Sequence, residues 1–147
     1  MTAGPWIAFG QFLEDESAGL HSLAVHELLV ALVTNAWSPD VAADEVWGDI
    51  SANEVDATGN GYAPQVTTGS LSRTGTTVTF DGTDVTFAAS GAAIEDARYA
   101  VIYNSDSADR LVCYCLLDVT PADVDIPAGS VMRLKMHAAG IGQKAPA

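Results

Sequence analysis

Basic residues are scarce in this chain. Six lysines and arginines stand against nineteen aspartates and glutamates, a formal net charge of −13 over 147 residues. Nucleic-acid binding depends on cationic surfaces that release counterions from the phosphate backbone, so the composition excludes the usual electrostatic footprint of a nucleic-acid-binding protein. We expect the acidity to serve solubility and self-repulsion, or a surface that faces solvent and avoids DNA.

Cysteines are also few. Cys113 and Cys115 are the only two, and a C-x-C spacing on a strand places both thiols on one face, poorly oriented for a mutual disulfide. Two thiols with no histidine nearby in the sequence are too few for a zinc site. We therefore expect small core residues in a reducing compartment.

Long apolar runs are missing. No stretch approaches the roughly 18 consecutive apolar residues of a membrane span, and residues 1–10 lack the basic residue that precedes the apolar run of a secretory signal. We expect no membrane partner and no export by a signal of the chain's own.

Motifs of catalysis are missing as well. The sequence has no G-x-S-x-G, no phosphate-binding glycine loop and no dinucleotide fingerprint, and His26-Glu27 begins an H-E-x-x-H motif that the next residues do not complete. The acidic loops 81–84 and 104–109 do not match an EF-hand, and hairpin loops use the same residue types. We predict no catalytic residue, no metal and no cofactor. The alternative is a hydrolase-type enzyme, with His21, His26 and His137 as its candidate residues.

What the chain does contain predicts one globular domain. A chain of 147 residues with 48% apolar residues is long and apolar enough to bury a core without a metal or disulfide. Its N-terminus is unusually apolar, and a short helix is predicted over 9–18, with Phe9, Phe12 and Leu13 on one side and acidic residues on the other. We divide the chain into an N-terminal arm and helix, residues 1–20, and a β domain, residues 21–147. The arm packs either on its own domain or on a neighbouring subunit.

Residues 28–33 and 76–87 carry the first β signals. The run LLVALV at 28–33 predicts a buried strand. Asp81-Gly82 between the alternating segments 76–80 and 85–87 predicts a hairpin. In either loop register Val78, Phe80, Val85 and Phe87 share one face of it.

A second hairpin is predicted from 98–103 and 111–117. Both strands are apolar on both faces, which is typical of central, covered strands. They indicate an antiparallel β-sandwich, or a sheet with one face covered by a partner. We predict a loop over 121–127, a strand over 130–136 with Met132, Leu134 and Met136 facing inward, and a tail over 140–147.

The stretch 47–64 has no regular period. We interpret it as an Ω-type loop pinned by Trp47 and Tyr62, with Gly59-Asn60-Gly61 as the reversal between them. A surface loop that contacts a partner is the other interpretation.

Four segments stand out: LLVALVTNAW at 28–37, VWGDISANEV at 46–55 followed by GNGY at 59–62, ARYAVIYN at 97–104, and LVCYCLL at 111–117. Together they resemble a family of small virion structural proteins of tailed bacteriophages. The resemblance covers roughly residues 8–136. It implies a jelly-roll type β-sandwich that decorates the outside of a phage head.

The resemblance also implies partners and a location. Proteins of this kind bind the outside of the major capsid protein shell and bridge neighbouring subunits. We therefore expect a capsid decoration (cement) protein that is made in the host bacterial cytoplasm, lies on the virion exterior and also forms a dimer or trimer. For the contacts with these partners we select Trp6, Ile7, Phe9, Trp47 and Tyr62. The alternative virion position is in the tail or a receptor-binding fibre.

Overall fold

The computed structural model describes residues 3–120, 122–136 and 140–146. Within them the chain forms the following elements: β1 (Ile7–Ala8), α1 (Gly10–Ser17), β2 (Leu28–Thr34), α2 (Trp47–Ile50), the 3₁₀ turn η1 (Ser51–Asn53), β3 (Gln65–Thr67), β4 (Gly69–Thr74), β5 (Thr77–Gly82), β6 (Val85–Ala88), β7 (Ile94–Asn104), β8 (Arg110–Leu116), β9 (Val124–Ile126), β10 (Val131–Leu134) and β11 (Gly142–Lys144).

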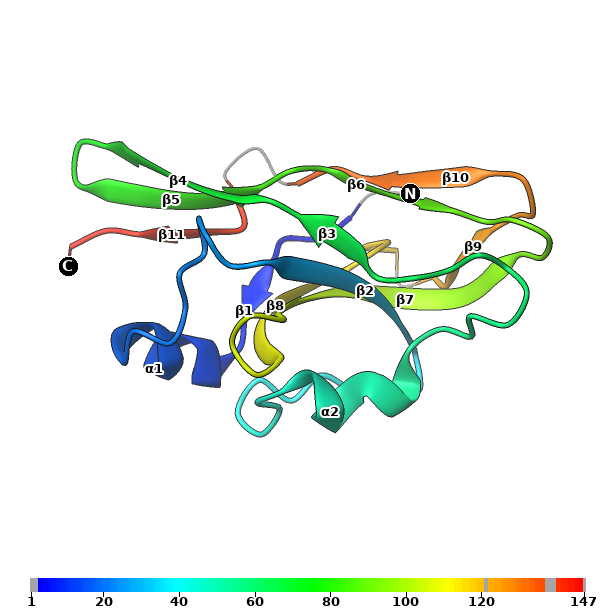
Figure 1. The fold of residues 1–147 in the computed structure, drawn as a ribbon, viewed down its shortest axis with the longest axis horizontal. Coiled ribbons are helices and arrows are strands. Elements are labelled where there is room, and N and C mark those ends of the chain that lie inside the picture. The colour runs from blue at the N-terminus through cyan, green and yellow to red at the C-terminus, as the bar shows by residue number, and fades with distance from the viewer. Residues whose placement is uncertain (1–2, 121, 137–139, 147) are drawn as a thin grey trace.

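The strands make two layers (Figure 1). The first layer is one sheet in the order β1-β8-β7-β2-β3, with β9 paired to β7. The second layer has two parts, β10-β6 and β11-β5-β4. Every strand pair is antiparallel, so the all-β, sandwich-like fold predicted from the sequence is confirmed.

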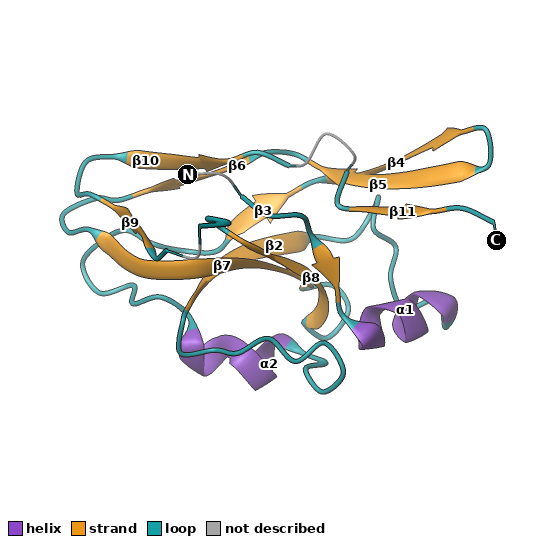
Figure 2. Cartoon of the chain, turned by 180° about the vertical axis from the view of Figure 1, so that it is seen from behind, coloured by secondary structure: helices purple, strands orange, loops and turns teal. Residues whose placement is uncertain are grey.

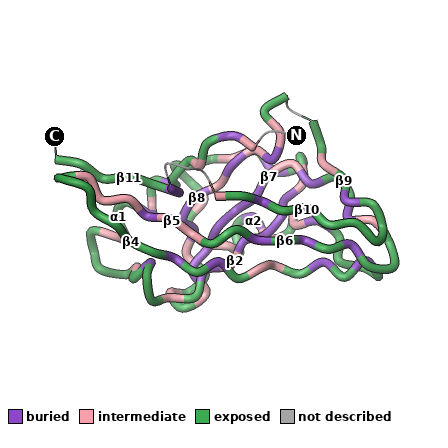
Figure 3. Tube along the Cα trace, turned by 90° about the horizontal axis from the view of Figure 1, so that it is seen from above, coloured by how far each residue is buried: buried purple, intermediate pink, exposed green. Residues whose placement is uncertain are grey.

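The central strands β2, β7 and β8 are covered on both faces, which explains their doubly apolar pattern. Leu32 lies opposite Ala100, and Ala100 lies opposite Cys115; all three are buried on the face toward the second layer. The other face is covered by the chain's own loops and helices, because the Trp37 ring packs on Tyr99 and Tyr114 at centroid distances of 5.1 and 5.4 Å. Figure 2 shows α2 beneath this face, and Figure 3 shows the buried residues running along the central strands. A partner is not needed to cover this sheet.

Both cysteines are buried free thiols in this core. Burial raises the pKa of Cys115 to about 12 and raises that of Cys113 as well. Both thiols therefore stay protonated and unreactive at neutral pH.

The first predicted hairpin is wrong in its pairing. β5 and β6 do not pair with each other: β5 pairs with β4 and β11, and β6 pairs with β10. The actual turn is Gly75-Thr76, between Thr74 and Thr77, and Gly75 has the positive φ, 60°, that a type II′ turn requires at its first central position. The shared face predicted for this hairpin falls with the pairing, although Phe80, Val85 and Phe87 are all buried.

The segment at Asp81–Asp84 is instead a crossing from one part of the second layer to the other. Beside this crossing lies Thr68, the single residue that connects β3 in the first layer to β4 in the second. Thr83 N donates to Thr68 O (3.1 Å), Thr68 N donates to Thr83 Oγ1 (3.0 Å), and Thr67 Oγ1 donates to Thr83 O (2.8 Å). These three hydrogen bonds hold Thr67 and Thr68 against Thr83, at the place where the chain passes from β5 to β6.

The second hairpin is confirmed as β7–β8, and the inward-facing Met132 and Leu134 of β10 are confirmed as buried. Two segments predicted to be irregular are strands: the 121–127 loop contains β9, and the 140–147 tail contains β11. Both strands are three residues long and show too little alternation to be recognised.

The N-terminal segment is built into the first sheet. Ile7 lies opposite Tyr114 and Ala8 opposite Cys113, so β1 is an edge strand of the domain itself. The helix predicted over 9–18 is α1, but Asp15, which was expected on its exposed side, is buried. The segment 1–20 therefore packs, where described, on its own domain.

Candidate interaction surface

Trp47 anchors the stretch 47–64, which starts as helix α2 rather than as an irregular loop. The indole is half-buried and stacks on the Tyr103 ring, with centroids 4.8 Å apart and planes 6° apart. Its backbone N–H donates to Asp109 O at 2.8 Å. Trp47 therefore holds α2 against the β7–β8 hairpin, and only part of its surface is open to a partner.

Tyr62 anchors the other end and is buried. Its hydroxyl accepts a hydrogen bond from Leu32 N and donates one to Glu54 Oε1, each at 2.8 Å. Its ring stacks on Phe87 of β6. Burial raises the pKa of Tyr62, and burial likewise raises the pKa of Glu54. Tyr62 thus joins the two β layers, and its side chain is not available to a partner.

The three N-terminal residues selected as contacts differ in exposure. Phe9 is fully buried and packs on Tyr114 with ring centroids 5.6 Å apart. Trp6 is half-buried against the core, while Ile7 is exposed. Phe9 is a core residue, which leaves Ile7 and the exposed parts of Trp6 and Trp47 as surface among the five selected residues.

An apolar groove that the sequence did not indicate lies between α1 and the overhanging strands β4, β5 and β11 (Figure 1). Its cavity is about 110 Å³. Leu13 of α1 and Leu71 of β4 line it and are 52% and 55% exposed. The ion pair Lys144 Nζ–Glu16 Oε2, at 2.6 Å, lies among the lining residues. The residues that line it lie as far apart in the sequence as Ala8 and Lys144, so no local pattern could have predicted the groove.

Charge is divided between the two layers. The stretches 69–88 and 131–144, which contain the strands of the second layer, carry four basic and two acidic residues, whereas the rest of the chain carries two basic and seventeen acidic residues. The second layer is therefore the one large part of the sequence that is not strongly acidic. Its outer side exposes Val131, which is 66% exposed.

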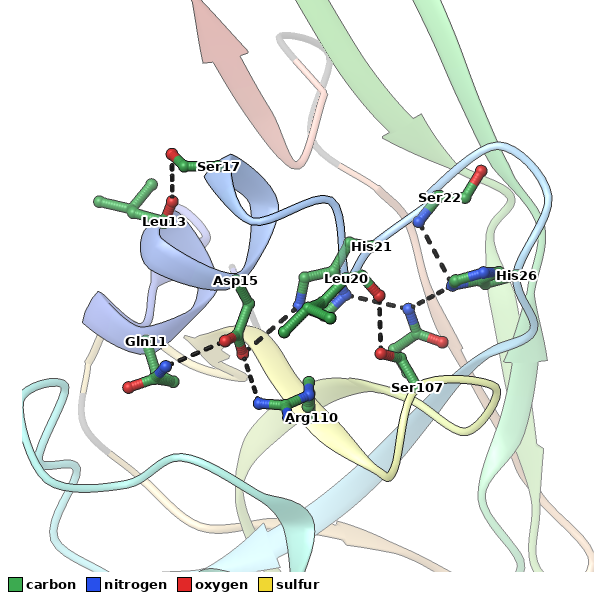
Figure 4. A network of polar contacts seen from close by, with 11 residues as sticks. Gln11, Leu13, Asp15, Ser17, Leu20, His21, Ser22, His26, Ser107 and Arg110 are labelled. Carbon is green, nitrogen blue, oxygen red and sulfur yellow. Dashed lines mark hydrogen bonds and ion pairs between the residues drawn. The ribbon is translucent and has the colours of Figure 1, made fainter.

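A buried polar network joins α1 to the β7–β8 hairpin (Figure 4). The buried Asp15 carboxylate accepts hydrogen bonds from Gln11 Nε2 (2.9 Å) and Arg110 Nη1 (3.1 Å). His21 Nε2 lies 3.9 Å from the same carboxylate. The acidic residue in the interior is thus neutralised by Arg110 rather than left unpaired.

Asn104 forms the second half of this network. Its Nδ2 lies 2.9 Å from Nδ1 of both His21 and His26, and its Oδ1 accepts from Asp106 N at 3.2 Å, which sets the orientation of the amide. The two amide hydrogens therefore each go to one imidazole, so both Nδ1 atoms are acceptors and both rings carry their proton on Nε2.

His21 cannot act on a substrate in this arrangement. Its side chain has no exposed surface, and Nε2 has no hydrogen-bond partner among the described residues. Burial lowers the pKa of His21, since desolvation opposes the charged form. His137, the third candidate of the enzyme alternative, lies outside the described residues.

In each of the two acidic loops, 81–84 and 104–109, one carboxylate accepts hydrogen bonds from outside its loop. Asp84 accepts from Arg133 Nη2 and from Met136 N, and Asp106 accepts from Glu27 N. A wider acidic cleft of about 460 Å³ is lined by Glu54, Asp56, Glu95 and Asp96 among others. Across residues 3–120, 122–136 and 140–146, no three His, Cys, Asp or Glu side chains are grouped so that they could hold a metal ion.

Comparison with known proteins shows no family for this chain. It matches no protein-family model, and no curated protein or solved structure was found to be similar to it. Within the part of the chain that the structure describes, no helix has the length and hydropathy needed to cross a bilayer.

Proposed function

We propose that this protein is a capsid decoration (cement) protein of a tailed bacteriophage, a jelly-roll type sandwich that binds the outside of the major capsid protein shell. The observation that carries the proposal is the division of charge. A protein that attaches many copies to one shell needs one side that approaches the shell and another that faces solvent. The second layer, with four basic and two acidic residues, suits the first task, and the strongly acidic remainder suits the second.

The segments that resemble phage virion proteins support the same proposal through their structural role. In VWGDISANEV and GNGY the aromatic residues Trp47 and Tyr62 tie the connecting stretch to Tyr103 and Leu32. These are fold-defining contacts rather than catalytic ones. The resemblance is thus one of architecture, and a decoration protein needs architecture and a binding face, with no catalytic group.

The test is binding to heads assembled from the major capsid protein of the same phage. Val131→Glu places a carboxylate on the exposed outer side of the second layer, whereas Val41→Glu places one on the acidic side, where Val41 is 37% exposed. In co-sedimentation, wild type and Val41→Glu should bind and Val131→Glu should bind at least roughly tenfold more weakly, a loss of about 1.4 kcal/mol. Circular dichroism checks that both variants fold.

Labelling of the protein in intact virions decides its position. Gold label on the head supports the proposal, and label confined to the tail refutes it. Equal loss of binding in the two variants would refute the assignment of the face while leaving the position on the head intact.

A further inference from the structure

A single edge runs through both layers along residues 65–74, and along it only Thr67 and Gly69 are buried. β3 is the last strand of the first sheet, and β4 is the last strand of the β11-β5-β4 sheet. Thr68 joins them, so one stretch of chain forms the edge of both layers. All residues of β4 except Gly69 are exposed, as Figure 3 shows.

The backbone of β4 offers free hydrogen-bonding groups along this edge. Thr83 N donates to Thr68 O, which makes Thr68 a residue whose backbone faces β5. Because bonded and non-bonded positions alternate in an antiparallel pair, Gly69, Leu71 and Arg73 direct their N–H and C=O groups away from β5.

The edge carries almost none of the features that usually block strand pairing. Natural edges are protected by several charges, by prolines or by bulges. From Gln65 to Thr74 the only charged residue is Arg73, there is no proline, and the register of β4 with β5 is unbroken.

The distribution of charge indicates which kind of partner can pair with this edge. Two copies that each carry −13 repel one another over most of their surfaces. Residues 57–80, however, contain no aspartate or glutamate, so two copies can approach along this edge without carboxylates facing each other across the contact.

We propose that this edge binds a second copy of the chain, β4 against β4 in antiparallel pairing about a twofold axis. The register follows from the free positions. Outward-facing residues must pair with outward-facing residues, and the centred arrangement places Leu71 opposite Leu71 of the second copy and Gly69 opposite Arg73. Each such pair exchanges two hydrogen bonds, and the two exposed leucines cover one another on the groove side of the sheet.

Sedimentation velocity and cysteine cross-linking test the register, independently of capsid binding. Wild type should sediment at twice 15.2 kDa. Leu71→Cys lies on the twofold axis and should form a disulfide with its copy under mild oxidation, because directly opposed Cα atoms lie about 5.5 Å apart, within disulfide range. Ser72→Cys, an exposed neighbour of the same strand, is the matched control and should not cross-link to itself.

A third variant tests the edge itself. Leu71→Pro removes an outward N–H and no hydrogen bond to β5, so it should yield a folded monomer. A monomeric wild type, a dimer that persists in Leu71→Pro, or cross-linking of Ser72→Cys as fast as that of Leu71→Cys would overturn the proposal. If Leu71→Pro fails to fold by circular dichroism, the cross-linking pair decides alone.

Discussion

Replacing Asn104 by aspartate should reverse the pH dependence of stability. In the wild type the amide donates to Nδ1 of both His21 and His26, each at 2.9 Å, and Asn104 is fully buried. A carboxylate at position 104 has no hydrogen to donate and carries a negative charge. The same geometry then favours a protonated His21, because an Nδ1–H can donate to the new carboxylate.

The sign in the wild type follows from the lowered pKa of His21. Below pH 6.5, the ordinary pKa of histidine, His21 binds a proton in the unfolded chain more readily than in the folded chain. The free energy of unfolding therefore falls as the pH falls below 6.5. For one proton the slope is at most about 1.4 kcal/mol per pH unit. The charged and titratable groups that act on this ring are Asp15, Glu16, Arg110 and His26, and all of them are retained in the variant.

In Asn104→Asp the folded pKa of His21 should lie above 6.5. The contribution of this site to stability is then fully present at low pH and is lost as the pH rises through the folded pKa. The free energy of unfolding therefore changes with pH in the opposite direction to that of the wild type. At pH 8 the variant should also be less stable by about 2–4 kcal/mol, since a buried carboxylate faces unprotonated rings.

Urea unfolding followed by tryptophan fluorescence at pH 5.5, 6.5, 7.5 and 8.5 measures both slopes. The difference between variant and wild type cancels the titration of groups outside the Asn104 network, so it reports on position 104 and the two rings bonded to it. His21→Gln is the control, since it removes the titrating ring and should flatten the slope below pH 6.5. A variant slope of the same sign as the wild-type slope would refute the hydrogen-bond assignment around Asn104.

Three further experiments test other parts of the structure. Tyr62→Phe removes the acceptor of the buried Leu32 N–H and the donor to Glu54, so it should lower the free energy of unfolding by about 1–3 kcal/mol in urea; no change would show that water replaces the hydroxyl. Gly69→Ala should lower the free energy of unfolding by about 1–3 kcal/mol, because a Cβ at this position would clash with Leu23 O and the Phe80 ring. Gly75→Ala is the control: its Cβ would meet no neighbouring atom, so the only cost is the strain of the positive φ. Cys113 and Cys115 should resist a thiol reagent at pH 8 until the protein unfolds, given the raised pKa values of both thiols; rapid labelling of the native protein would contradict their burial.

The sequence predicted the elements whose signals are local and strong. The continuous apolar run of β2, the doubly apolar β7 and β8 and the alternation of β10 each reflect burial that a strand's own residues reveal. The class of fold followed from them.

Elements defined by their neighbours could not be predicted in this way. β4 has a single apolar residue, Leu71, in an otherwise polar exposed strand, so alternation was not visible. Asp81-Gly82 has hairpin composition, yet the chain crosses there between two sheet parts, because the Gly75 turn and the Thr68–Thr83 hydrogen bonds already pair β5 with β4. The groove and the Asn104 network each join residues more than 75 positions apart in the sequence. No short stretch of sequence therefore shows that these residues lie together.

The order in which the chain visits the two layers has a consequence for folding. β1 to β3 belong to the first layer, β4 to β6 to the second, β7 to β9 to the first again, and β10 and β11 to the second. No single cut of the polypeptide separates the layers, so neither layer can be completed by an N-terminal or a C-terminal fragment alone. Residues 1–92 and 93–147 each hold strands of both layers, and each should remain unfolded until mixed with the other. The protein should accordingly unfold in one cooperative transition, with the hydrophobic core forming only after the last strands have been synthesised.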